Sequence, residues 1–71
     1  MGHREHQMIL NQVYTALAEK GYSPTEQIIG YIITGDPTYI TNHKGARLAI
    51  VQVDRHDLLK EIVAGFFATM P

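Results

Sequence analysis

The chain has 71 residues, no cysteine and a formal net charge of −1. The missing cysteines exclude disulfides and thiolate metal sites, and six dispersed basic residues argue against nucleic-acid binding, which needs a basic stripe. No apolar run reaches the roughly 18 residues of a transmembrane helix, so we expect a cytoplasmic protein without membrane insertion.

The composition favours association with a partner. We expect one helical domain over residues 1–71, with residues 1–5 disordered or partly cloning-derived. A domain this small has a thin stability margin, and oligomerisation is one common remedy. Charged residues make up only 18% of the chain, below the roughly 25% of typical soluble domains. Some apolar surface is therefore expected to face a partner.

A first helix is predicted over residues 4–20. Its apolar positions recur at helical spacing and form one face: Ile9, Val13, Ala16 and Leu17. Gly21 follows at a position where a helix commonly ends in the left-handed conformation, which glycine adopts without a Cβ clash. We therefore expect positive φ at Gly21.

A second helix is predicted from Pro24 to Gly35. Ser23 and Glu26 have the spacing of a capping box, and Pro24 suits the first helical position. A buried strand over residues 28–33 is the alternative, and the cap signals at both ends favour the helix. Gly30 costs roughly 1 kcal/mol relative to Ala inside a helix, which favours close approach of another helix over a tolerated inefficiency.

The middle of the chain is less regular. Asp36-Pro37 repeats the pattern of an acceptor side chain followed by proline and predicts a short helical turn over residues 37–41. Residues 42–45 have the composition of a loop. Residues 46–53 favour helix, but their alternation and β-branched side chains leave a strand open.

The last helix is predicted to begin after Asp54, the expected N-cap. An apolar stripe follows, wider than a monomer of this size needs, and it predicts a shared dimer core. The stripe continues to Met70, and the expected interface residues are Leu58, Leu59, Ile62, Val63, Phe66 and Phe67.

The sequence contains no candidate for catalysis or cofactor binding. His3 and His6 are spaced i, i+3, but no third ligand lies close in sequence, so we expect no metal site. His56 and Asp57 have no nucleophile beside them, and helix capping explains them better than an oriented base. We therefore expect neither an enzyme nor a bound cofactor.

Residues spread along the chain resemble the IreB family. The similarity covers residues 13–67 and is most specific over residues 21–40. It rests on Glu19-Lys20-Gly21-Tyr22, Pro24, Gln27-Ile28-Ile29-Gly30-Tyr31, Gly35-Asp36-Pro37, Tyr39-Ile40, His43-Lys44 and Ala46-Arg47.

The resemblance implies an all-helical homodimer among small cytoplasmic proteins of Gram-positive bacteria. It also implies a substrate of a transmembrane Ser/Thr kinase and its phosphatase, acting as a negative regulator of resistance to cell-wall antibiotics. Two departures matter. Residues 1–12 contain no Thr or Ser, whereas the family's phosphorylated threonines lie in a longer N-terminal segment, so the phosphosite is unknown. Residues 48–53 are uncharged and more apolar than the family's basic helix.

Together these observations predict an all-α protein, a compact bundle of about five short helices forming a homodimer. The expected function is non-enzymatic regulation through a protein partner or kinase. Tyr22, Asp36 and Tyr39 flank the second helix and are the expected partner surface. The first alternative is a small helical nucleic-acid-binding protein, and a weaker one is an enzyme of unknown type.

Overall fold

The protein is all-α over the part of the chain that the structure, a computed structural model, describes, which is residues 2–68. The elements in chain order are α1 (His3–Glu19), α2 (Pro24–Thr34), η1 (Pro37–Tyr39), η2 (His43–Gly45), α3 (Ala46–Ile50) and α4 (Arg55–Ala68). Four α-helices and two 3₁₀ helices thus replace the expected set of about five. Met70 lies outside the described residues.

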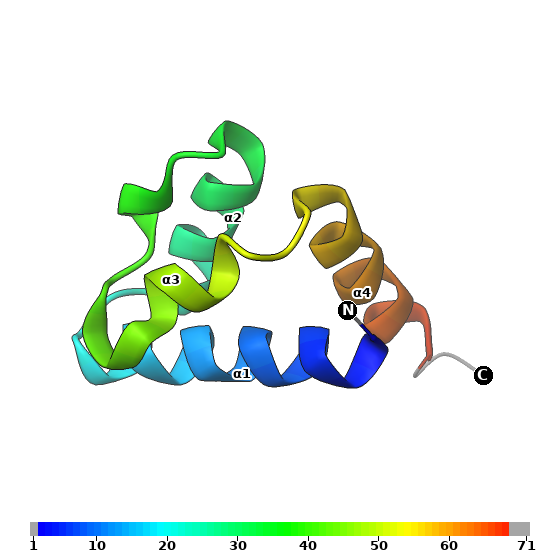
Figure 1. Cartoon of the computed structure of the whole chain (residues 1–71), viewed down its shortest axis with the longest axis horizontal. Coiled ribbons are helices and arrows are strands. Elements are labelled where there is room, and N and C mark those ends of the chain that lie inside the picture. Colours follow the sequence, from blue (N-terminus) through cyan, green and yellow to red (C-terminus); the bar gives the residue numbers. More distant parts are fainter. Residues whose placement is uncertain (1, 69–71) are drawn as a thin grey trace.

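Helix α1 forms the base of the molecule. Helices α2 and α3 lie over it, and α4 lies near its N-terminal end (Figure 1). The core collects side chains from all four α-helices and from the connections before and after α3, and the largest fully buried ones are Val13, Leu17, Ile40, Ile50 and Leu58. Each such side chain contributes roughly 1.5–3 kcal/mol when it leaves water, so these few residues hold the helices together.

The predicted helix ends are confirmed. Gly21 has φ +82° and Gly35 has φ +74°, both in the left-handed region. At the end of α2, the Arg55 guanidinium also donates from Nη1 to the carbonyl of Ile32 at 2.9 Å. A cation there satisfies a helix-end carbonyl and complements the negative end of the helix dipole.

The start of α2 follows the sequence signal in part. Pro24 is the first helical residue, and Ser23 Oγ accepts from the Glu26 N–H at 3.5 Å. Within the described residues, no reciprocal bond from Ser23 N–H to the Glu26 carboxylate forms. The cap is therefore one-sided, and half of the predicted capping box is absent.

Gly30 is a site of close packing, as predicted, but its partner differs. A Cβ at Gly30 would overlap the ring of Tyr39, which comes from η1 rather than from another α-helix. The Tyr39 carbonyl also accepts from Gln27 Nε2 at 3.0 Å. Helix η1 therefore folds back along α2, and the missing side chain at Gly30 makes room for the ring.

The segment after η1 differs most from expectation. Residues 43–45 form η2 instead of a loop, with Lys44 at φ +52°. The Lys44 carbonyl accepts from Gln12 Nε2 of α1 at 3.1 Å, which anchors this turn. The favoured helix over residues 46–53 is confirmed against the strand, but α3 ends at Ile50.

The N-terminal end also differs from expectation. We expected residues 1–5 to be disordered or partly cloning-derived. Residues 3–5 instead form the first turn of α1, and Glu5 Oε2 accepts from the Gly2 N–H at 3.0 Å. Residue 1 lies outside the described residues.

Candidate interaction surface

Helix α4 exposes most of its apolar stripe. Among its described residues only Leu58 is buried, and its burial is complete, which places Leu58 in the core of a single chain. The other five expected interface residues are exposed by 38–67%, namely Leu59, Ile62, Val63, Phe66 and Phe67. The predicted interface therefore rests on these five residues.

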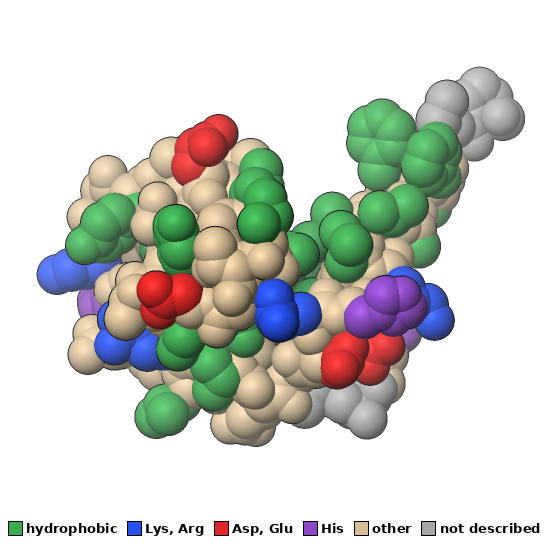
Figure 2. All heavy atoms as spheres, turned by 90° about the horizontal axis from the view of Figure 1, so that it is seen from above, with side chains coloured by type: hydrophobic (Ala, Val, Ile, Leu, Met, Phe, Trp, Pro, Cys, Tyr) green, Lys and Arg blue, Asp and Glu red, His purple; other side chains and the backbone are tan. Residues whose placement is uncertain are grey.

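Helix α2 continues this apolar surface. A groove of about 450 Å³ between α2 and α4 is lined by Tyr14, Thr25, four isoleucines of α2, Leu59 and Ile62. Ile29 and Ile33 on its α2 side are 46% and 74% exposed. Figure 2 shows hydrophobic side chains along the projecting α4 and on the part of the body that faces it. We call this combined surface the apolar face.

Helix α4 is packed only in part against the rest of its own chain. Helix α4 has 14 residues, about the length at which isolated helices are marginal in water. Most helical stability in proteins comes from tertiary packing of an apolar side, and within this chain only Leu58 of the described α4 residues is fully packed. The exposed stripe is thus the kind of surface that protein–protein contacts cover.

The three expected partner-surface residues do not form one patch. Tyr22 is 52% exposed and lies before α2, whereas Asp36 lies beyond its other end. Eleven helical residues separate these ends by roughly 16 Å. Tyr39 lies between them because its ring packs over Gly30, and it is 36% exposed. Neither ring is buried, so both keep surface for a partner.

Asp36 organises the turn that it begins. Its Oδ1 accepts from the Thr38 N–H at 3.0 Å and from the Thr38 hydroxyl at 2.7 Å. The backbone hydrogen bond from Thr38, then its hydroxyl, and the attraction of Arg47 hold the pKa of the Asp36 carboxyl below its ordinary value. Asp36 is exposed, and its lowered pKa keeps the carboxyl charged at neutral pH. Its hydrogen bonds to Thr38 fix the orientation of the carboxylate at the start of η1.

An ion-pair cluster joins the end of α1 to η2. Glu19 Oε2 contacts Lys44 Nζ at 3.2 Å, and Glu19 Oε1 contacts His43 Nε2 at 3.1 Å. The hydrogen bond from Lys44 and then that from His43 lower the pKa of the Glu19 carboxyl. Glu19 and Lys44 are exposed, His43 is half-buried, and the cluster holds η2 against α1.

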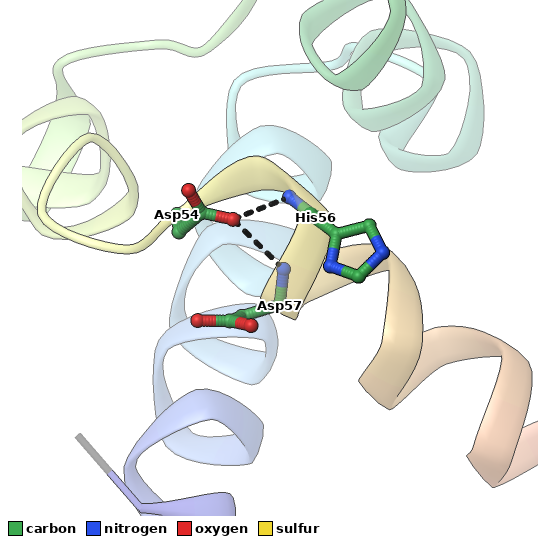
Figure 3. Close-up of side chains that lie close together, drawn as sticks. All are labelled: Asp54, His56 and Asp57. Atoms are coloured by element: carbon green, nitrogen blue, oxygen red, sulfur yellow. Dashed lines mark hydrogen bonds between the residues drawn. The ribbon is translucent and has the colours of Figure 1, made fainter.

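A second polar cluster is explained by helix capping. Asp54 Oδ1 accepts from the His56 N–H at 2.9 Å and from the Asp57 N–H at 3.2 Å (Figure 3). This confirms Asp54 as the N-cap of α4. Possible metal-ligand atoms of Asp54, His56 and Asp57 lie within 4.8 Å of one another, but all three residues are exposed. The cap accounts for their proximity.

A third cluster was not foreseen from the sequence. Glu61 of α4 lies against the two histidines of α1: His3 Nδ1 contacts Glu61 Oε2, and His6 Nδ1 lies 3.6 Å from Glu61 Oε1. No local sequence signal points to Glu61, because it follows His6 by more than fifty residues and meets it only in the folded chain.

The comparisons with known proteins identify the family. A family model described as IreB regulatory phosphoprotein matches residues 1–68. The chain belongs to the IreB family. It is also similar to a UPF0297 protein of Lachnoclostridium phytofermentans, with 54% identity over 55 residues that cover 78% of this chain and 62% of the relative. The chain thus spans less than two thirds of the length of that curated relative.

Membership of the IreB family confirms the predicted resemblance and places the chain in a family described as regulatory phosphoproteins. Within residues 2–68, no helix combines the length and the hydropathy needed to cross a bilayer.

Proposed function

We propose that this protein is a non-enzymatic regulator that acts in the cytoplasm of a Gram-positive bacterium as a homodimer. It is linked to a Ser/Thr kinase and lowers resistance to antibiotics that attack the cell wall. The observation that carries the proposal is the match of residues 1–68 to a family of regulatory phosphoproteins. The motif block over residues 21–40 supports the same assignment.

The apolar face supports association of two copies. Leu59 and Ile62 line the groove with Ile29 and Ile33, so the surfaces of α2 and α4 are continuous. Exposed apolar surface of this kind costs free energy in water, and covering it recovers roughly 25 cal/mol per Å². A second copy offers the same stripe, which makes the contact self-complementary, as in most symmetric dimers.

Tyr22 and Tyr39 support recognition by another protein. Both rings stand beside α2, a capped helix that presents them on a rigid support. Tyrosine combines apolar area with a polar tip, and it is enriched among the residues that carry binding energy at interfaces. The apolar face would be covered in the dimer, whereas these two tyrosines lie outside it and stay available to a regulatory partner or kinase.

The test is deletion and complementation in the native host. Deleting the gene should raise growth in the presence of a cell-wall antibiotic, and the wild-type gene should reverse this. A variant with both Tyr22→Ala and Tyr39→Ala should be present at normal level and folded, yet fail to complement, because it loses the partner contact.

Leu48→Ala is the matched control, since Leu48 is 71% exposed on α3 and lies outside both surfaces. This variant should complement fully. A deletion that leaves antibiotic sensitivity unchanged, or that increases it, would contradict the regulatory assignment. Complementation by the double tyrosine variant would instead move the partner surface elsewhere on the molecule.

A further inference from the structure

Three side chains of types that commonly bind metals lie near one another where α1 meets α4, with Glu61 in contact with each histidine, although their ligand atoms are not all within 4.8 Å of one another. His3 and His6 lie one helical turn apart on α1, so their side chains share one face of that helix. Glu61 reaches them from α4 and presents one carboxylate oxygen to each imidazole. The cluster therefore links the first turns of α1 to α4, two parts of the chain that contribute few side chains to the core.

His6 is the unusual member of the cluster. It is 7% exposed, and its Nδ1 is buried without a hydrogen-bond partner among the described residues. Glu61 is also largely buried, with 17% of its side chain exposed. A buried polar atom without a partner costs roughly 1–3 kcal/mol, so this arrangement calls for an explanation.

The distance between His6 Nδ1 and the Glu61 carboxylate provides such an explanation. His6 Nδ1 and Glu61 Oε1 are 3.6 Å apart, which is too long for a hydrogen bond. Two ligands that each lie about 2.0–2.2 Å from one tetrahedral ion are separated by roughly 3.4 Å. The separation is thus close to that of two ligands sharing one small cation.

We propose that His6, Glu61 and His3 bind a divalent transition-metal ion of the Zn²⁺ class, which fastens α4 to α1. Imidazole nitrogen and carboxylate oxygen suit Zn²⁺, whereas Mg²⁺ and Ca²⁺ prefer all-oxygen sites. His6 and Glu61 already lie at a separation suited to a shared ion. His3, whose side chain is 67% exposed on the first turn of α1, turns to complete the set, and water takes the remaining position.

The Asp54, His56 and Asp57 cluster provides an internal comparison. It brings similar ligand types together, but its residues are exposed and its geometry follows from helix capping. It contains no buried atom that lacks a partner. The two clusters therefore make opposite predictions about which histidine controls metal affinity.

The test is titration of the chelator-treated full chain with Zn²⁺, followed by calorimetry, and with Co²⁺, followed by visible absorption. We expect one ion per chain and a rise in melting temperature with Zn²⁺ but not with Mg²⁺. His3→Ala should weaken Zn²⁺ binding at least about tenfold, as should Glu61→Gln. His56→Ala should leave the affinity unchanged.

His3→Ala keeps the test decisive because an exposed residue at a helix start can be removed without unfolding the chain. Equal Zn²⁺ affinity in wild type and His3→Ala would overturn the proposal, as would loss of affinity in His56→Ala. A melting temperature that responds to pH but not to Zn²⁺ would assign the cluster to proton binding and would also overturn it. The proposal is independent of the regulatory function.

Discussion

Gly35 carries two separate constraints. Its φ of +74° is unfavourable for residues with a Cβ, and an added Cβ would lie 2.8 Å from Cζ of Arg55. Gly21 carries only the first constraint, because its φ is +82° and no atom lies within 4 Å of an added Cβ. Comparing the same substitution at Gly21 and at Gly35 therefore separates the cost of backbone strain from the cost of losing the Arg55 contact.

Gly21→Ala should lower the free energy of unfolding by about 1–2 kcal/mol through left-handed strain alone. Gly35→Ala should cost about 1 kcal/mol more, because it also displaces Arg55 from the Ile32 carbonyl. Urea denaturation of both variants measures the difference. Equal losses would show that the Arg55 contact contributes nothing to stability.

At the scale of elements, Glu19 couples η2 to the end of α1. Its contacts with Lys44 and His43 lower the pKa of its carboxyl in the folded chain. A carboxyl whose folded pKa lies below its unfolded pKa stabilises the fold above the unfolded value. That contribution is lost as the pH falls below about 4.3 and through the folded pKa.

Glu19→Gln should therefore lower stability at neutral pH and make little difference in strong acid. Lys44→Met should reproduce the effect, since Lys44 is the largest cause of the lowered pKa. Denaturation curves for wild type and both variants across the acidic range test this. The predicted contribution of Glu19 to stability would be contradicted if Glu19→Gln were as stable as wild type at neutral pH. It would also be contradicted if the loss of stability in Glu19→Gln persisted unchanged in acid. Asp36, whose pKa is also lowered, supplies part of the remaining acid sensitivity.

At the scale of the whole molecule, the apolar face predicts a dimer. Val63 on α4 and Val51 after α3 are matched probes, because they are 46% and 45% exposed. Val63→Asp places a charge where a partner copy should cover the chain, and burying an unpaired charge is costly. Val51→Asp makes the same change away from the apolar face.

Sedimentation at about 10 μM should show two chains per particle for wild type and for Val51→Asp, and one chain for Val63→Asp. The melting temperature of wild type should also rise with protein concentration, as expected when association stabilises the fold. A wild-type monomer with intact helicity would contradict the dimer. So would dissociation of both variants alike.

Local signals in the sequence determined where the helices begin and end. The caps at Ser23 and Asp54, and the left-handed positions of Gly21 and Gly35, depend on residues only a few positions apart. Such interactions form within one turn of backbone, so the order of residues is enough to predict them. The motif block over residues 21–40 likewise sufficed to predict the family.

Only the tertiary structure decided which side chains meet across the chain. The stripe of α4 reads as one surface, yet α4 packs against the body so that Leu58 is buried and the rest of its apolar side stays exposed. Tyr39 fills the space over Gly30, and Glu61 reaches His6 of α1. These contacts join residues distant in sequence. Helical periodicity predicts which face is apolar, but which part of that face the chain itself covers depends on how the connections orient each helix.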